Sequence, residues 1–286
     1  MSVDPGPVIQ SALLRSALVR LRREKGVTQE EVAKVLEWSP SKVIRVEGGR
    51  SSITKVDLDA LLVLYGVGSE RERERLHELN RGARGSGWWL PYRGDVSDAY
   101  LNYVGYEAGA TFIRQFHGAI VPGLLQTPEY ARAILSIEGT SAASIKLRFQ
   151  RQEELARRGD PPRQNYVVDE AAIRRHVGVK TDPGIMPAQL HHIIDMVEAA
   201  EWVTVRVVPF DVGEHAGMAG PFTLLEFMGD LSDLLYLDGV HSSLALVTGD
   251  NPLIADYHDY FEALLDASLP LDQSLELIRK TAAEMT

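Results

Sequence analysis

The chain has 286 residues, a formal net charge of −10 and no cysteine. This length suits two domains, and the lack of cysteine excludes disulfides and thiolate metal sites. We find no signal peptide and no apolar run of membrane-spanning length, so we expect a cytoplasmic protein with no membrane partner. Residues 1–85 contain 15 basic and 12 acidic residues, a net charge of +3, whereas the remainder contains 15 and 28, a net charge of −13. Only the first part is therefore suited to the phosphates of nucleic acid.

Residues 28–36 are predicted to form a short helix. Thr28 is a good N-cap, and Glu31 three residues later completes a capping box. Val32 and Ala33 supply an apolar face at helical spacing. The small side chain of Ala33 lets a following helix cross closely.

Residues 40–47 are predicted to form a second helix. Ser39 caps it, and Pro40 takes the first helical position, where its missing N–H costs nothing. We expect its apolar side chains, Val43, Ile44 and Val46, to pack on the preceding helix. The polar side chains that remain to face outward are Ser41, Lys42 and Arg45. Two short helices joined by a tight turn present a recognition helix to the DNA major groove in this way.

Further helices are predicted on both sides of this pair. Leucines recur along a basic segment from residue 14 to 25, and residues 53–67 and 70–80 continue the helical pattern. Residues 81–87, with the sequence RGARGSG, are predicted to be a flexible linker because three of the seven are glycine. The expected domains are thus 1–80 and 88–286.

Residues 10–67 resemble the lambda-repressor/Cro-like (XRE) DNA-binding domain, most clearly over LRREKGVTQEEVAKVLEWSPSKVIRVEGGR. The resemblance implies that Gln29 touches a backbone phosphate and that the start of the third helix meets bases. The DNA contacts that we expect are Gln29, Ser39, Ser41, Lys42, Arg45 and Arg50. The family often has glycine in the turn, where this chain has Glu37 and Trp38. The alternative, a plain helical bundle with a solvated charged face, does not explain why the caps, the turn and the spacing agree.

From residue 88 onward the pattern changes to mixed helix and strand. An amphipathic segment at 100–113 is predicted to run into the first strand. The other predicted strands lie at 165–169, 203–209, 222–227 and 234–237. Two helices are predicted to start at residues 128 and 170. Four more are predicted at 144–158, 187–200, 252–267 and 272–283. The expected fold class is an all-α N-terminal helix-turn-helix domain followed by an α+β C-terminal domain.

The second part also resembles a family. Five runs appear in order: VPGLLQTPEYARA, RQEELARRGDPPRQNYVVDEAAIRRHVG, QLHHIIDM, VVPFDVGEHAGMAGPFTLLEF and LLYLDG. They are similar to the C-terminal domain of the WhiJ-like regulators of actinomycetes. The resemblance implies an antitoxin-like transcription regulator and a small acidic protein partner.

Carboxylates and histidines follow two of the predicted strands. Asp169 and Glu170 end one strand with His176 six residues later, and Glu214 and His215 lie in a glycine-rich loop after another. Such a cluster could form a metal or hydrolytic site. The plainer interpretation is that Asp169 or Glu170 caps the following helix and that the loop only connects strands. We predict no catalytic residue, no metal ligand and no cofactor.

A binding role is easier to motivate. Trp88 and Trp89 supply candidate apolar walls, and Glu214 and His215 candidate polar anchors, for a ligand or partner. An ordinary core role for these and the neighbouring tyrosines remains open. We expect a sequence-specific DNA-binding transcription regulator whose C-terminal domain senses a ligand or a small protein and forms a homodimer. The alternative is a DNA-binding protein with a hydrolase-like or metal-dependent enzyme domain.

Overall fold

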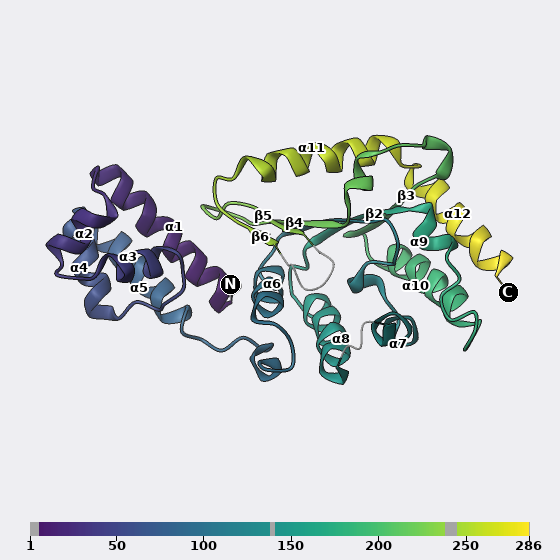
Figure 1. The fold of residues 1–286 in the computed structure, drawn as a ribbon, viewed down its shortest axis with the longest axis horizontal. Coiled ribbons are helices and arrows are strands. Elements are labelled where there is room, and N and C mark those ends of the chain that lie inside the picture. The colour runs from purple at the N-terminus through teal and green to yellow at the C-terminus, as the bar shows by residue number, and fades with distance from the viewer. Residues whose placement is uncertain (1–5, 138–140, 238–244, 286) are drawn as a thin grey trace. The chain divides into compact units, whose positions relative to one another are not determined.

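The computed structural model describes residues 6–137, 141–237 and 245–285. The chain divides into two compact units, Met1–Leu90 with Met228–Leu231 and Pro91–Phe227 with Ser232–Thr286. The first is built from helices, and the second combines a mixed sheet with helices (Figure 1). The predicted fold class is therefore confirmed. The last two residues of the run LLYLDG lie outside the described residues.

The N-terminal unit contains the helices α1 (Pro7–Lys25), α2 (Gln29–Val35), α3 (Pro40–Glu47), α4 (Lys55–Tyr65) and α5 (Glu70–Gly82). Four of them start at a hydroxyl side chain that accepts a hydrogen bond from the backbone three residues later, as N-caps do: Thr28, Ser39, Thr54 and Ser69. Their apolar faces meet in one core, in which Val32, Leu58, Leu62 and Leu76 have no exposed surface.

The turn between α2 and α3 contains a residue in the left-handed conformation that glycine usually adopts, although this residue is Glu37. Glu37 has φ of +54°, in the left-handed region. The Trp38 N–H donates to the Ala33 carbonyl at 2.8 Å and the Glu37 N–H to the Lys34 carbonyl at 3.4 Å. This is the Schellman pattern that ends helices. The capping box of Thr28 with Glu31 is present as predicted.

The predicted linker starts too early. Arg81 and Gly82 are the last residues of α5, and the Arg84 guanidinium donates to the Ile53 carbonyl at 2.6 Å. Gly82 lies beside α1, where a Cβ would come within 1.5 Å of Oε1 of Gln10, so a larger residue at this position would require the Gln10 side chain to move. The helix therefore continues past the start of the predicted linker.

The C-terminal unit is organised around a six-stranded sheet with the order β3-β2-β1-β4-β5-β6. Its strands are β1 (Phe112–His117), β2 (Arg163–Asp169), β3 (Val203–Val208), β4 (Phe222–Glu226), β5 (Leu234–Leu237) and β6 (Ala245–Val247). The first three run parallel, and the last three continue antiparallel from β1. The first strand therefore begins at residue 112, and β6 was not predicted from the sequence.

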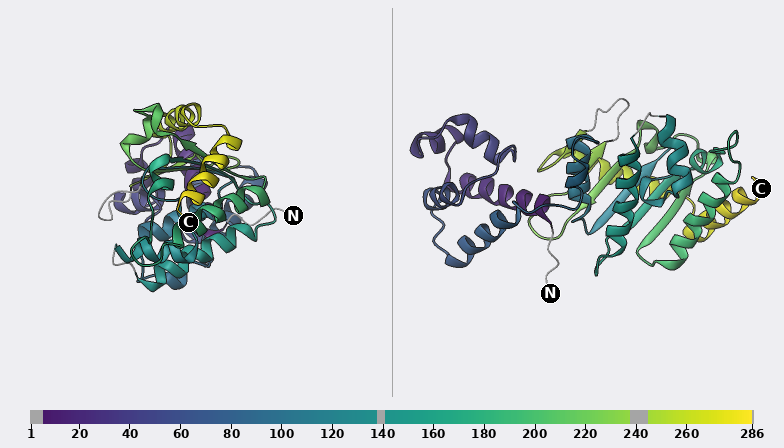
Figure 2. Two further views of the ribbon diagram at one scale, coloured as in Figure 1. Left: turned by 90° about the vertical axis from the view of Figure 1, so that its right-hand side faces the viewer. Right: turned by 90° about the horizontal axis from the view of Figure 1, so that it is seen from below.

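Helices cover both faces of this sheet. They are α6 (Asp98–Glu107), α7 (Pro128–Ile137), α8 (Ala142–Ala156), α9 (Glu170–Arg174), α10 (Ile185–Ala199), α11 (Pro252–Ala267) and α12 (Leu271–Glu284). Within this unit, α11 lies on one face, and α6, α7, α8 and α10 lie on the other (Figures 1 and 2). The core under α11 includes the rings of Phe116, Phe222 and Phe261.

The sheet brings the ends of distant segments together at one place. The carboxyl ends of β1 and β2 lie side by side because these strands are parallel, with His117 opposite Val168. The start of β4 meets the same end of β1, where Phe222 pairs with Phe116. The strand order also reverses between β1 and β4, because β2 and β3 extend the sheet on one side of β1 and β4 to β6 extend it on the other. Open sheets bind ligands at such a switch in strand order, beyond the carboxyl ends of the strands.

The buried carboxylate of Glu107 on α6 is fully paired. Glu107 is 1% exposed and accepts two hydrogen bonds from Arg151 at 2.7 and 2.6 Å and one from the Tyr103 hydroxyl at 2.6 Å. Tyr92, Tyr103 and Tyr130 are all buried, so the ordinary core role left open for the tyrosines is correct.

Among the described residues, no helix combines the length and apolar character needed to cross a membrane.

Candidate functional site

The outward face of α3 is formed by Ser41, Ile44 and Arg45, all exposed. Val43 and Val46 are buried against the other helices. Ile44 was expected to be buried with them, and that expectation is wrong, because its side chain is 48% exposed. Positions three apart share a helix face, whereas the next residue is turned by about 100°.

Lys42 lies beside this face but is already engaged. Its ammonium is 2.9 Å from Oδ1 of Asp57 on α4 and 3.8 Å from the ring centroid of Trp38. Burial acts to raise the pKa of Asp57. The hydrogen bond and positive charge of Lys42, together with hydrogen bonds from Thr54, outweigh burial, so the pKa of Asp57 is lowered. The structure thus gives Lys42 a bracing role between the turn and α4.

Gln29 is also held within the domain. Its amide donates to Oε2 of Glu47 at 2.7 Å, and the Arg22 guanidinium binds the same carboxylate through two contacts of 2.7 and 3.1 Å. The side chains of Arg22 and Glu47 are only 14% and 7% exposed. This triad joins α1, α2 and α3, and therefore sets how α3 projects from the domain.

Ser39, Arg45 and Arg50 are the remaining residues predicted to contact DNA, and all three are exposed. The Ser39 hydroxyl accepts from the Lys42 N–H at 3.3 Å as the cap of α3. Within the part of the chain that the structure describes, the guanidinium groups of Arg45 and Arg50 have no ion-pair partner. They are thus available to an external anion.

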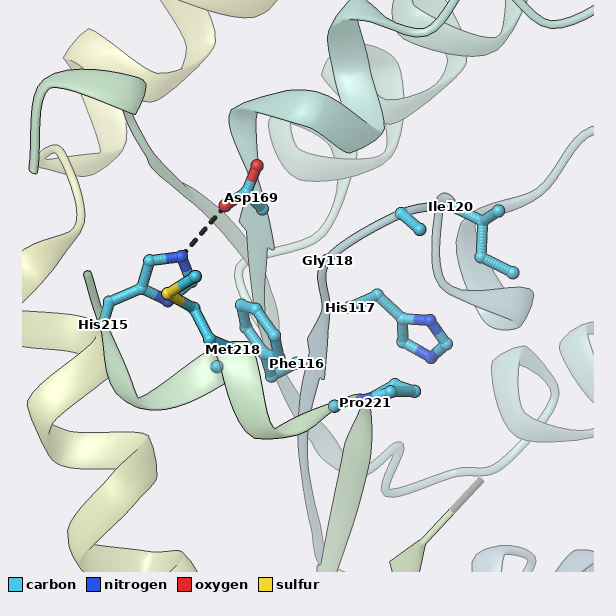
Figure 3. A pocket seen from close by; sticks show the side chains of 11 residues that line it. Phe116, His117, Gly118, Ile120, Asp169, His215, Met218 and Pro221 are labelled. Carbon is cyan, nitrogen blue, oxygen red and sulfur yellow. Dashed lines mark hydrogen bonds and ion pairs between the residues drawn. The ribbon is translucent and has the colours of Figure 1, made fainter. Parts of the chain in front are cut away.

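A second candidate site is a cavity of about 490 Å³ at the carboxyl ends of β1 and β2 (Figure 3). It occupies the switch between β1 and β4 described above. Most of its walls are apolar or glycine, with three polar side chains among them; the lining residues are Phe116, His117, Gly118, Ala119, Ile120, Asp169, His215, Gly217, Met218, Gly220 and Pro221. A mostly apolar cavity with few polar groups is typical of a small-molecule site.

His215 and Asp169 form a pair at one side of this cavity. Nε2 of His215 is 3.0 Å from Oδ2 of Asp169, and the imidazole side chain is 8% exposed. Because an ionised Asp169 only accepts, Nε2 carries the proton. The other oxygen of Asp169 accepts from the Ala171 N–H at 2.7 Å, so Asp169 also caps α9, as the plainer interpretation held. Nδ1 of His215 is buried and has no hydrogen-bond partner among the described residues.

The loop that carries His215 is packed closely on β1. A Cβ at Gly217 would lie 2.1 Å from the ring of Phe116, so only glycine fits there. The His215 and Phe116 rings meet edge to face, with centroids 5.8 Å apart. Gly213 and Gly220, on either side, have φ of +76° and +125°, and allow the chain to turn back to the sheet.

His117 lies on the other side of Phe116 from His215 (Figure 3). Its Nε2 is 2.9 Å from the amide nitrogen of Gln115, which can only donate, so Nε2 accepts and is unprotonated. Burial, with the positive charge of Arg148, lowers the pKa of His117 to about 4. The cavity therefore presents a neutral imidazole at neutral pH. Sequence analysis missed this residue, although its position at the end of a strand was a usable signal.

The structure brings together only some of the residues predicted for ligand or partner binding. His215 lines the cavity, whereas Glu214 is exposed and does not line it. Trp88 and Trp89 belong to the N-terminal unit and are not part of the lining. Trp89 is 4% exposed and packs on Gly87. Asp169, predicted only as part of a metal or hydrolytic cluster, is the residue that joins His215.

The predicted carboxylate and histidine cluster is thus reduced to one pair. His176 instead lies 2.8 Å from the Pro183 carbonyl. No group of three or more candidate metal ligands occurs within residues 6–137, 141–237 and 245–285.

Two family models match the chain. A helix-turn-helix domain matches residues 13–76, and a domain of unknown function (DUF5753) matches residues 100–280. Neither the curated proteins nor the solved structures that were compared contain a match. The first match covers most of α1, the whole of α2, α3 and α4 and the first half of α5, and identifies the N-terminal unit as a DNA-binding domain. The second covers more than half of the chain, including the sheet and the whole cavity, so the protein belongs to the DUF5753 family, with a helix-turn-helix DNA-binding domain at its N-terminus.

Proposed function

We propose that the protein is a sequence-specific transcription regulator of the XRE type whose C-terminal domain senses a ligand. The observation that carries the proposal is the pairing of two sites in one chain. The first is a helix α3 that presents Ser41 and Arg45 on a DNA-binding fold. The second is an apolar-walled cavity with buried polar groups on a separate sheet domain.

The DNA-binding part is tested through Arg45. Its guanidinium is exposed and has no described ion-pair partner, so Arg45→Ala removes an external contact without uncovering a buried charge. Losing one base or phosphate contact costs about 1–3 kcal/mol, a loss of roughly 5- to 150-fold in affinity. Arg71→Ala, on the exposed surface of α5, is the matched control for the lost charge.

The measurement is affinity, at fixed salt, for the DNA sequence that the full-length protein selects from a random library. We expect Arg45→Ala to bind at least fivefold more weakly and Arg71→Ala within about twofold of the unchanged protein. Equal affinity of the Arg45→Ala variant and the unchanged protein would refute α3 as the recognition helix.

The sensing part rests on the cavity. A ligand seated there contacts His215 and Asp169, which connect the loop of residues 209–221 to the sheet. Binding changes the DNA response only if the ligand prefers one arrangement of the DNA-binding heads over another. A small acidic protein is the second candidate ligand of the C-terminal domain, suggested by the resemblance of this part to WhiJ-like, antitoxin-like regulators.

Native mass spectrometry of the protein purified from its own cells tests this part. We expect a co-purified mass that is lost in His215→Ala and retained in Glu214→Ala, the control whose side chain does not line the cavity. The size of that mass distinguishes a small molecule from a protein partner. If no mass is bound and His215→Ala regulates as the unchanged protein does, the sensing proposal fails and the DNA-binding proposal stands.

A hydrolytic role is the second candidate function, and the His215 and Asp169 pair favours it. A carboxylate-oriented imidazole is a common general base. The described lining contains no serine, threonine or lysine that this base could activate, so the attacking group would be water. Hydrolytic activity that disappears in both His215→Ala and Asp169→Asn would favour this alternative over ligand sensing.

We also propose that the protein binds DNA as a homodimer. One helix-turn-helix head reads only a few base pairs, and two half-sites about 34 Å apart suit a two-fold arrangement. The C-terminal domain supplies the expected dimer surface.

A further inference from the structure

Ile44 is an apolar side chain that lies between two polar ones, Ser41 and Arg45, on the exposed face of α3. It follows Ser41 by one helical turn and directly precedes Arg45, and all three are exposed. Nearly half of its surface, 48%, is open to solvent, whereas its neighbours in the same helix, Val43 and Val46, are 2% and 4% exposed. The core therefore does not account for an isoleucine at this position.

The base edges of the major groove offer one group that matches such a side chain. Guanine and adenine edges present hydrogen-bond acceptors and donors, and cytosine presents an amino group. Thymine presents its C5-methyl group, which apolar side chains contact. An isoleucine placed against the polar edges would remove water from them without replacing its hydrogen bonds. A buried isoleucine–methyl contact gains free energy instead.

We infer that Ile44 reads a thymine methyl group in the operator, next to the base pair that Arg45 reads. The inference rests on the proposed function of α3 as the recognition helix. Consecutive Cα atoms are about 3.8 Å apart, close to the rise of about 3.4 Å between stacked base pairs. The two side chains leave the helix in directions about 100° apart, but their Cα atoms are close enough for both to contact the same base pair or adjacent ones. Because arginine most often binds guanine, each half-site should contain a guanine with a thymine beside it, on either strand.

Replacing thymine by deoxyuridine tests this contact directly. Deoxyuridine lacks only the methyl group and keeps every hydrogen-bonding group of thymine. The full-length protein is first used to select its operator from random DNA, and each thymine of a half-site is then replaced in turn. At one position we expect an affinity loss of about fourfold, the value that corresponds to one buried methyl group. At the other positions we expect little change.

Variants at residue 44 complete the test as a double-mutant cycle. Ile44→Ala should bind the thymine operator at least fourfold more weakly and should no longer distinguish thymine from deoxyuridine at the sensitive position. Ile44→Val, which keeps a branched apolar group, should retain most of the discrimination. Because the side chain is exposed and alanine favours helices, both variants should keep the circular dichroism and thermal unfolding of the unchanged protein.

Two outcomes would overturn the inference while leaving specific DNA binding intact. In the first, deoxyuridine has no effect at any position. In the second, Ile44→Ala still loses fourfold on deoxyuridine, which would show that the side chain acts elsewhere, for instance in a contact between two copies of the chain. Failure to select any sequence would instead refute the proposed function itself.

Discussion

The buried imidazole of His117 should make the stability of the C-terminal domain depend on pH. The residue is 8% exposed, and burial together with the charge of Arg148 lowers its pKa to about 4. In the unfolded chain the histidine pKa is about 6.5. As the pH falls below 6.5, the unfolded chain takes up a proton that the folded domain does not bind, so folding stability falls.

The size of the effect follows from these two pKa values. The full difference corresponds to about 3 kcal/mol, which is lost between pH 6.5 and pH 4. Well above pH 6.5 the imidazole is neutral in both states and contributes no pH dependence. Between pH 7 and pH 5 the free energy of unfolding should therefore fall by about 2 kcal/mol because of this residue alone.

The perturbation that isolates this contribution is His117→Gln. Glutamine does not titrate, and its side-chain oxygen can accept from Gln115 as Nε2 does now. Hydrogen exchange in peptides that cover β1, measured in the intact chain across a urea series, gives the free energy of unfolding for this domain. We expect the loss between pH 7 and pH 5 to be about 2 kcal/mol smaller in His117→Gln than in the unchanged protein.

The control is His191→Gln, which changes a histidine on the exposed side of α10. It should leave the pH dependence nearly as it is in the unchanged protein. If His117→Gln and the unchanged protein lose equal stability between these pH values, the imidazole is not held neutral by burial and the reasoning fails.

Four further predictions concern residues that support the two sites and the oligomeric state of the protein. Glu47→Ala leaves the Arg22 guanidinium buried without its partner and should destabilise the N-terminal domain by about 3 kcal/mol, measured by calorimetry. A loss below about 1 kcal/mol would contradict the role of Glu47 in joining α1, α2 and α3. Glu37→Gly removes a side chain from a left-handed turn and should stabilise the same domain by up to about 1 kcal/mol. Thermal unfolding that shows no gain in stability would contradict this prediction. Gly217→Ala places a Cβ against Phe116 and should cost about 1–3 kcal/mol, seen as faster hydrogen exchange in β1; unchanged exchange would argue against this packing. Sedimentation at micromolar concentration should show a dimer, and a monomer both free and on DNA would refute the proposed homodimer.

Much of the N-terminal domain could be predicted from the sequence because its signals are local. The capping box of Thr28 with Glu31 and the cap at Ser39 each depend on residues within one helical turn. The sequence also showed which part of an acidic chain is suited to DNA. It did not show that Gln29 and Lys42 are engaged by Glu47 and Asp57, because those partners lie 18 and 15 residues away.

The exposure of Ile44 could not be predicted from the sequence. The sequence predicted that the apolar residues at 43, 44 and 46 all pack on the preceding helix, but the helix can bury only those that point at its neighbours. Which ones do so depends on how α3 is set against α1 and α2. The Arg22, Gln29 and Glu47 contacts join those helices, and they exist only in the folded domain.

In the C-terminal domain too, local features could be predicted from the sequence, whereas contacts between distant segments could not. The sequence determined its class and most of its strands, since β-branched runs and helix caps are local patterns. Only the tertiary structure decided that β4 runs antiparallel beside β1, and this pairing creates the cavity. It also brought His215 to Asp169, 46 residues apart in sequence, left Trp88 and Trp89 out of the lining, and made His117 a buried neutral imidazole. The physical reason is that helix and strand propensities act over a few residues, whereas burial, ion pairing and pKa depend on which distant segments pack together.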